Sequence, residues 1–281
     1  MIFEINYNEL QVPLMMIKEL LTDKEYKGDV KQITFEVTKE KAMLLFSDDR
    51  LGVRMKVELD GAQAELPGVA TCSFSSFFEM VKVFKKSEEP ILVEREGEFI
   101  RVDDGVYPEE MLKLKQDETP NLLPNTELVE PLLGISGVRL RDGIQLASTI
   151  VRKTDIPADM IDTQAVYLGT EGDVVTFNSF SLHNFHRSKR MGTVYQEGMV
   201  QLTKPVASAL AKIADVSKKS IEEWSLSSVN GEELLDKGIL MKSADENISL
   251  FFTLSPLANG DMVSNTFKTV ELNFKESMRL T

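Results

Sequence analysis

The stretch SFSSFFEMVKVFKK, residues 73–86, has apolar side chains at every third or fourth position. They are Phe74, Phe77, Phe78, Val81 and Phe84. Such spacing predicts a helix that packs one apolar stripe against a sheet. Ser76 and Glu79 also have the spacing of a capping box at a helix start. The three lysines of this stretch lie off the stripe, so we expect a cationic outer side.

Strand patterns surround this helix. Apolar and other residues alternate in residues 33–37 and again in residues 53–59, with a turn-like Ser-Asp-Asp at 47–49 between them. After the helix, ILVEREGEFIRVDDG (residues 91–105) predicts strand, turn and strand. The alternation favours half-buried antiparallel strands rather than a parallel sheet.

The second half of the chain repeats the first. A helical pattern covers residues 139–154, strand patterns follow at 165–168 and 174–177, and a second helix covers 203–219, opening with Thr203 and an early Pro205. Its stripe of Val206, Leu210 and Ile213 has the spacing of Phe77, Val81 and Phe84. Two similar units of about 130 residues, each with more strands than helices, predict an α+β protein with mostly antiparallel sheet.

The domain limits follow from this repeat and from proline. Four of the ten prolines lie between Pro108 and Pro131 in a polar stretch, which is typical of a linker. We therefore expect domains at residues 1–110 and 135–257, a linker at 111–134 and a tail at 258–281.

The charge balance changes meaning once it is divided by position. The chain has 32 Lys and Arg against 45 Asp and Glu, a net charge of −13, which argues against general binding to nucleic acid. The three predicted helices at 73–86, 139–154 and 203–219 nevertheless carry eleven basic and three acidic residues, +8, which leaves −21 for the rest. A fourth predicted helix, residues 10–24, differs because Lys18 and Lys24 are matched by Glu19 and Asp23. The alternative is that these lysines are the ordinary wet side of amphipathic helices.

Several kinds of site are not indicated. Cys72 is the single cysteine, so no internal disulfide or cysteine-based zinc site is expected, and a reducing compartment is favoured. There is no signal-peptide pattern, no apolar run long enough for a membrane span, and no phosphate-binding or nucleophile motif. His183 and His186 have a possible metal-ligand spacing, but in a strand they would point to opposite faces. We expect no catalytic residue, no metal, no cofactor, no enzyme activity and a cytoplasmic protein.

Five segments resemble the DNA sliding clamps, the ring-shaped processivity factors of replicative polymerases. They are KAMLLFSDDRLGVRMKVEL (41–59), the helix at 73–86, ILVEREGEFIRV (91–102), TKPVASALAKIA (203–214) and NISLFFTLSPL (247–257). The closing strand is similar to those of proliferating cell nuclear antigen and the trimeric clamps of T-even-type phages, and the first helix and hairpin are similar to the bacterial β clamp. The resemblance implies the DNA clamp fold: two domains, each of two β-α-β-β-β units, with helices lining a ring and antiparallel sheets outside.

The resemblance also implies function and partners. A clamp encircles duplex DNA without reading its sequence, tethers the DNA polymerase and is placed on DNA by a clamp loader, here in a bacterial or phage-infected cytoplasm. Six domains per ring imply a homotrimer of two-domain chains. The residues expected to face DNA are Lys82, Lys85, Lys86, Arg139, Arg141, Arg152, Lys153, Lys204, Lys212, Lys218 and Lys219. The residues expected to form a pocket for partner peptides are Phe46, Arg50, Leu51, Val53, Leu122, Leu123, Leu254 and Pro256.

Other interpretations stay open at this point. Residues 270–278 echo the pattern of residues 3–10, which would fit a truncated third domain of a dimeric bacterial-type clamp, although an appended element is favoured. A clamp-like interaction or decoy protein that does not encircle DNA is a second alternative, and an enzyme of unrecognised type is a third. For Phe46, Val53 and Leu254, plain core packing competes with the pocket.

Overall fold

The computed structural model describes residues 1–21, 31–48, 52–107, 109–115, 123, 129–149, 165–180, 185–216, 223–230 and 237–254. Part of the predicted sites and the predicted tail, residues 258–281, lie outside the described residues. The predicted site residues concerned are Arg50, Leu51, Leu122, Arg152, Lys153, His183, Lys218, Lys219 and Pro256.

The described chain contains four β-α-β-β-β units in succession. The first is β1 (Ile2–Ile5), α1 (Tyr7–Leu20), β2 (Gln32–Val37), β3 (Ala42–Asp48) and β4 (Val53–Glu58). The second is β6 (Gly68–Ser73), α3 (Phe74–Val81) with its 3-10 extension η1 (Lys82–Lys86), β7 (Ile91–Glu96), β8 (Phe99–Asp103) and β9 (Glu110–Lys113). The third is β10 (Val129–Ser136), α4 (Gly137–Ser148), β11 (Ala165–Glu171), β12 (Val174–Phe180) and β13 (Phe185–Met191). The fourth is β15 (Met199–Thr203), α5 (Lys204–Val216), β16 (Glu223–Asn230), β17 (Lys237–Ser243) and β18 (Ile248–Thr253).

These units confirm the predicted α+β class and the repeat. Two short strands, β5 (Gln63–Leu66) and β14 (Thr193–Val194), are added between units. Regular structure also enters the predicted linker from both ends, because β9 ends at Lys113 and β10 begins at Val129.

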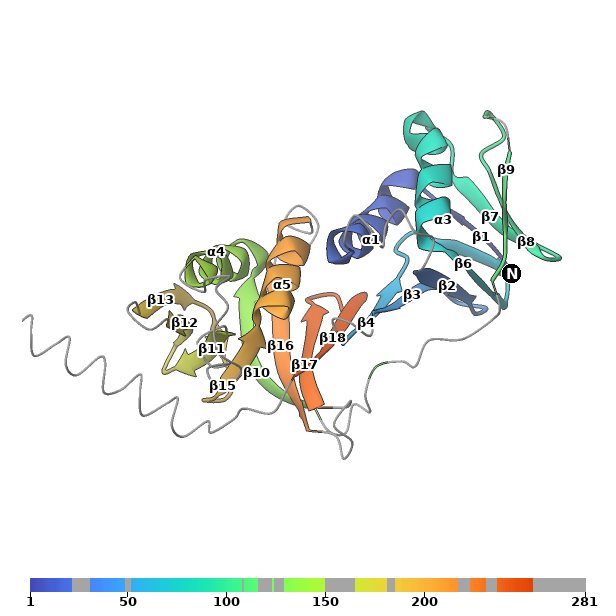
Figure 1. Cartoon of the computed structure of the whole chain (residues 1–281). Coiled ribbons are helices and arrows are strands. Elements are labelled where there is room, and N and C mark those ends of the chain that lie inside the picture. The colour runs from blue at the N-terminus through green and yellow to red at the C-terminus, as the bar shows by residue number, and fades with distance from the viewer. Residues whose placement is uncertain are drawn as a thin grey trace, which may run out of the picture.

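Three antiparallel sheets form the body of the molecule (Figure 1). Their strand orders are β5-β1-β7-β8-β9, β14-β10-β16-β17-β18-β4-β3-β2-β6 and β13-β12-β11-β15. In the nine-stranded sheet β18 pairs with β4, with Ile248 opposite Val57 and Phe252 opposite Val53. One sheet therefore continues from the first repeat into the second without a break.

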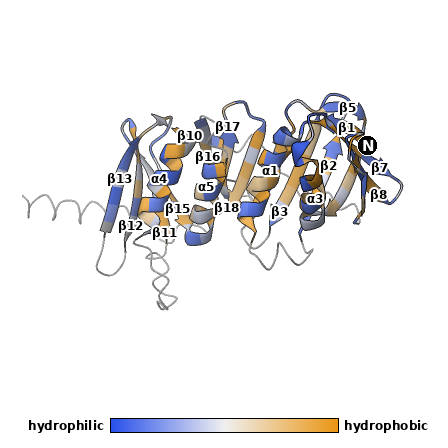
Figure 2. Ribbon diagram, turned by 90° about the horizontal axis from the view of Figure 1, so that it is seen from above, coloured by the Kyte–Doolittle hydropathy of each residue, from blue (hydrophilic) through white to orange (hydrophobic). Residues whose placement is uncertain are grey.

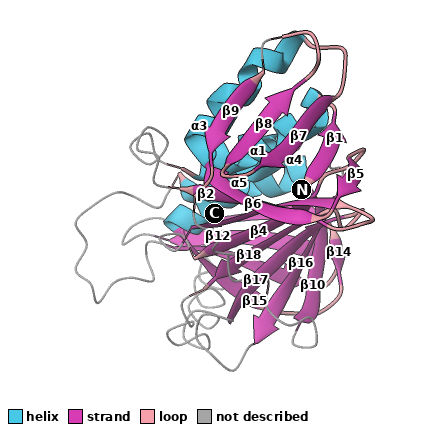
Figure 3. Cartoon of the chain, turned by 90° about the vertical axis from the view of Figure 1, so that its right-hand side faces the viewer, coloured by secondary structure: helices cyan, strands magenta, loops and turns pink. Residues whose placement is uncertain are grey.

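The helices lie together on one side of the nine-stranded sheet, as the view along the molecule shows (Figure 3). Each buries the predicted stripe against the sheets: Phe74, Phe77, Val81 and Phe84 of the second unit are at most 1% exposed. Leu140, Ile144 and Ala147 on α4, and Val206, Leu210 and Ile213 on α5, are buried in the same way. The stripe prediction is confirmed for these described positions.

Two details of the predicted helix at 73–86 were wrong. The α-helix ends at Val81 and continues as a 3-10 helix, whose three residues per turn keep Val81 and Phe84 on the core side while Lys82 and Lys85 stay exposed. The cap is Ser73 rather than Ser76, because the extended Ser73 ends β6 and its hydroxyl accepts a hydrogen bond from the Ser76 N–H at 3.4 Å.

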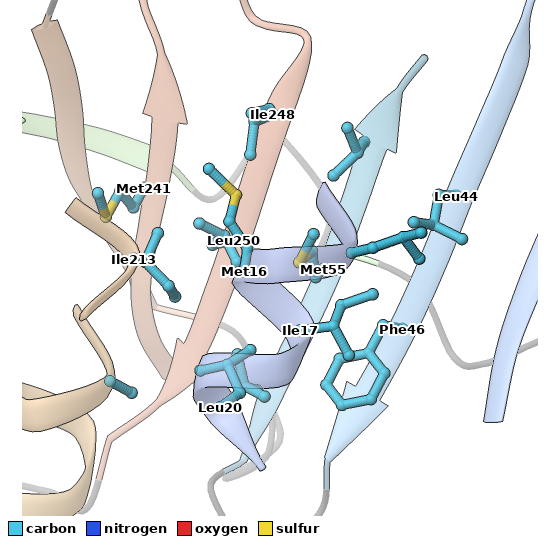
Figure 4. Close-up of a cluster of buried hydrophobic side chains, with 14 of the residues drawn as sticks. Met16, Ile17, Leu20, Leu44, Phe46, Met55, Ile213, Met241, Ile248 and Leu250 are labelled. Carbon is cyan, nitrogen blue, oxygen red and sulfur yellow. The ribbon is translucent and has the colours of Figure 1, made fainter. Parts of the chain in front are cut away.

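A single apolar core passes through the junction between the repeats (Figure 4). Met16 and Ile17 of α1 lie over β4 and β18, where Met55 and Leu250 face each other across the strand pair. All four are at most 1% exposed. The two repeats therefore share their hydrophobic core, in addition to the strand pairing.

Candidate nucleic-acid interface

The predicted DNA-facing residues that the structure describes lie on the helices. Those that are exposed point away from the buried stripes, since the stripes face the sheets. The exposed ones are Lys82, Lys85, Lys86, Arg139 and Lys212, and Lys204 is half-buried. Arg139 donates a hydrogen bond to the Met191 carbonyl at 3.1 Å, at the end of β13.

The acidic residues Glu79, Asp142 and Asp215 on the helices α3, α4 and α5 each form an ion pair with a basic residue of η1 or α4. Glu79 accepts a hydrogen bond from the Lys82 ammonium at 2.6 Å. Arg141 binds Asp142 at 2.8 Å and reaches Asp215 of α5 at 2.7 Å. Hydrogen bonds to Asp215 and then to Asp142 raise the pKa of Arg141. Arg141 thus links α4 to α5 through its ion pairs. Its guanidinium is therefore less free to contact DNA than the exposed lysines are.

On α1 the charges of Lys18 and Glu19 cancel when they are summed over the sequence, but in the structure the two side chains contact different groups. Lys18 lies over the ring of Phe78, with its Nζ 5.4 Å from the ring centroid. Glu19 instead faces α5, where its carboxylate lies 3.6 Å from the Lys212 Nζ and its backbone carbonyl accepts a hydrogen bond from the same ammonium at 3.1 Å. Adjacent residues on a helix point in different directions. A sum of the charges of Lys18 and Glu19 therefore overlooks that only Lys18 lies beside Phe78.

The four predicted peptide-pocket residues within the described part of the chain, Phe46, Val53, Leu123 and Leu254, do not lie together on one open surface. Phe46 and Val53 are 1% exposed and belong to the core beneath α1. Leu254 is half-buried and packs on that same core. Leu123 packs elsewhere, against a separate cluster of Val229, Leu240 and Phe251 on the β16, β17 and β18 strands. Core packing therefore describes Phe46 and Val53 in this structure.

A small open pocket of about 100 Å³ lies at the opposite end of the β4–β18 pair from Val53. Its floor includes the buried Val57 and Ile248. Its rim carries four carboxylates, from Glu9, Glu58, Asp60 and Asp245. This rim repels phosphate, in contrast to the lysines of the helix face.

The two ends of the molecule carry opposite charge clusters on the sheet faces away from the helices. Near β9, the single guanidinium of Arg101 is surrounded by Glu94 at 3.5 Å, Asp103 at 2.8 Å and Glu109 at 2.9 Å. Near β13, the single carboxylate of Glu171 binds both Arg187 and Lys189. Among these contacts of the described residues, three carboxylates surround one cation in the first cluster, and two cations surround one carboxylate in the second.

A metal site receives no support from the part of the chain that the structure describes. No group of three or more potential metal-ligating side chains occurs there. His186 is half-buried on β13, where burial and then the charge of Arg190 lower its pKa. In the same described part, no helix is long and apolar enough to cross a membrane.

The chain is similar to solved bacterial clamps. No protein-family model and no curated protein sequence matches it. It resembles the DNA polymerase sliding clamp from Bacillus subtilis (TM-score 0.72, 16% identity, 94% of this chain and 67% of that chain covered). Similar matches are the DNA polymerase III beta subunits from Thermotoga maritima (0.70, 12%, 94% and 67%) and Pseudomonas aeruginosa (0.70, 14%, 94% and 68%).

These matches agree with the four β-α-β-β-β units and with helices on one side of a continuous sheet. This chain spans about two thirds of the length of the solved chains, between 64% and 68% for the first four. The resemblance expected from the sequence is therefore confirmed for the fold. The chain has the fold of the DNA polymerase sliding clamps.

Proposed function

We propose that the chain is a DNA sliding clamp, a ring-shaped processivity factor that encircles duplex DNA and tethers a replicative DNA polymerase. The carrying observation is the position of its basic residues: exposed lysines of η1 and α5 lie on the helices on one side of a sheet that continues through both repeats. Within a protein of net charge −13, this face is the natural one for a polyanion.

The physical basis is electrostatic and independent of sequence. Lysines that contact phosphates release counterions and so hold the duplex, but they read no base edges and permit movement along the helix axis. Acidic groups elsewhere oppose binding of DNA outside the ring. The protein would act without catalysis or a cofactor, in a bacterial or phage-infected cytoplasm, with the polymerase and a clamp loader as its protein partners.

Ring closure follows a pattern already present within one chain. The β4–β18 pair joins the last strand of the first unit to the last strand of the fourth unit, and β9 and β13, the last strands of the second and third units, lie at the two ends of the described molecule. A head-to-tail contact of β9 with β13 of another copy would repeat that joint. Their opposite charge clusters support the pairing. Six domains then require three chains.

The mass of the assembled particle is the first test. Light scattering of the full chain at micromolar concentration should give three times the mass of 31.6 kDa. A stable monomer would instead support a clamp-like interaction or decoy protein. A dimeric ring formed by a longer chain with a third domain would support the truncated bacterial-type alternative.

The second test concerns the helix face. Replacing Lys82, Lys86, Lys204 and Lys212 together by Gln should abolish stimulation of processive synthesis on circular DNA. A matched control replaces four lysines outside the helices and outside β9 and β13, Lys39, Lys56, Lys237 and Lys242, and removes the same charge. Unchanged processivity in the first variant, or equal loss in both, would contradict the proposal.

A further inference from the structure

Two lysines from different helices meet over one aromatic ring. The Lys82 Nζ lies 4.6 Å from the centroid of the Phe78 ring, and the Lys18 Nζ lies 5.4 Å from the same centroid. Both distances are within the range of a cation–π contact. The two nitrogens are consequently no more than about 10 Å apart, the sum of these distances.

The ring is held firmly from below. Phe78 is 5% exposed, and its ring stacks on that of Phe74 with 5.5 Å between centroids. Phe74 is fully buried in the core. The negative face of an aromatic ring attracts ammonium groups. A buried ring packed on a second ring therefore restricts the positions of the two cations, a restriction that exposed lysines without such a contact would lack.

Other charged and polar groups complete the cluster. Glu79 binds Lys82, and Tyr7 lies close enough for the charge of Lys82 to lower its pKa, although burial is the larger effect and raises that pKa overall. The groups named here are two lysines, one glutamate and the phenol of Tyr7. The net charge of these groups is positive, so the cluster suits an anion.

We propose that Lys18 and Lys82 form one binding site for the phosphate backbone of duplex DNA, with Phe78 as the residue that positions both ammonium groups. This inference rests on the proposed function, because it requires DNA to pass along the helix face. Through Lys18 it adds α1 to the helices that contact DNA. The sequence alone had not indicated α1, because its basic residues are matched by acidic ones.

The physical argument concerns ordering. A free lysine loses about 1.5–2 kcal/mol of side-chain entropy when it is fixed on a ligand. Here the ring fixes two lysines before DNA arrives, so a smaller loss remains on binding. Each strand of DNA presents one phosphate per 3.4 Å of axis, so neighbouring phosphates can meet both ammonium groups.

The test compares two phenylalanines of the same helix. Phe78→Leu removes the ring beneath the lysines, whereas Phe74→Leu removes the fully buried ring on which Phe78 stacks. The affinity of the full chain for a labelled DNA duplex is measured by fluorescence anisotropy at several salt concentrations. We expect Phe78→Leu to weaken binding about threefold to tenfold and Phe74→Leu to have a smaller effect.

The lysines give a second measurement that does not alter the core. Lys18→Gln and Lys82→Gln should each reduce the slope of log affinity against log salt by about 0.9. Lys18→Gln should cost less affinity in the Phe78→Leu background than in the unchanged protein, because the ring then no longer positions Lys18. Glu79→Gln should strengthen binding, since it removes the carboxylate that competes with phosphate for Lys82.

Equal affinity of the Phe78→Leu and Phe74→Leu variants, or full additivity of Phe78→Leu with Lys18→Gln, would overturn the inference. If Phe78→Leu does not fold, the two lysine variants decide alone: an unchanged salt slope in both overturns the inference. Failure of the unchanged protein to retain duplex DNA would overturn the proposed function as well. Retention that is lost in the four-lysine helix variant, but is unaffected at Lys18 and Phe78, would refute only this inference.

Discussion

The joint between the two repeats and the two ends of the molecule use the same kind of strand edge in different ways. At the joint, β4 pairs with β18, and the side chains beneath α1 are apolar and buried, among them Met55 and Leu250. At the ends, β9 and β13 each have one strand neighbour within the described residues. Their surfaces carry exposed apolar side chains, such as Met111 at 48% and Met191 at 60%, together with charge clusters. Figure 2 shows most of β13 as hydrophilic, unlike β18.

If the ends join copies as proposed, this difference separates a permanent contact from a reversible one. Burial of apolar side chains contributes stability but does not select a partner, whereas opposite charges at an exposed edge favour one partner and disfavour the wrong one. The β4–β18 joint does not have to select a partner, because both strands belong to the same chain. Under the proposed function, an edge that joins another copy and opens again for DNA would be better served by charged side chains, which also discourage random pairing of an exposed strand edge.

The largest effect is expected from the buried joint. Leu250→Ala removes a fully buried side chain opposite Met55 and should lower the free energy of unfolding by about 2–5 kcal/mol. Leu112→Ala on β9, where the side chain is only half-buried, should cost about 1 kcal/mol. Urea denaturation followed by circular dichroism measures both. Equal losses would show that the joint is no better packed than the end.

A smaller effect, visible in assembly rather than in folding, is expected from the charges of the ends. Lys189→Glu should weaken self-association about tenfold or more, because it places a carboxylate opposite the acidic cluster around Arg101. Glu109→Lys should do the same from the other side, and the two changes together should restore assembly. Sedimentation velocity over a concentration series measures the dissociation constant.

Lys56→Glu is the control for this charge experiment. Lys56 lies on β4, within the joint that the chain already closes, so its reversal should leave assembly unchanged. If Lys56→Glu and Lys189→Glu weaken assembly equally, net charge rather than edge pairing controls self-association. Loss of assembly that the double reversal does not restore would also argue against a β9–β13 contact.

The sequence predicts elements better than it predicts their partners. The stripe at 73–86 could be predicted because a helix buries residues at a fixed spacing. The change to a 3-10 helix after Val81 could not, since a spacing of three is compatible with either helix. Pairing of β4 with β18 joins strands far apart in the chain, and an alternating strand fits many partners equally well.

The candidate site shows the same limit. The cationic side of the helices could be predicted from the positions of lysines, but not the arrangement of Lys18 and Lys82 over Phe78, which depends on how α1 crosses η1. Phe46 shows the limit from the other side. Its pattern is compatible with a pocket and with the core, and only the position of α1 above it distinguishes the two.

The smallest expected effect is a pH dependence confined to the β13 end. Burial and then Arg190 lower the pKa of His186, so the folded protein favours the neutral imidazole. The stability that this group contributes is complete above the ordinary pKa of 6.5 and is lost as the pH falls below it toward the lowered folded value. Hydrogen exchange at pH 7.5 and 5.5, corrected for the intrinsic exchange rate, should show reduced protection of β12 and β13 amides at the lower pH, with β4 and β18 unchanged. His186→Gln should remove most of that difference, because glutamine does not titrate; equal loss of protection in both regions, or a difference that persists in this variant, would place the acid sensitivity elsewhere than in the β13 edge.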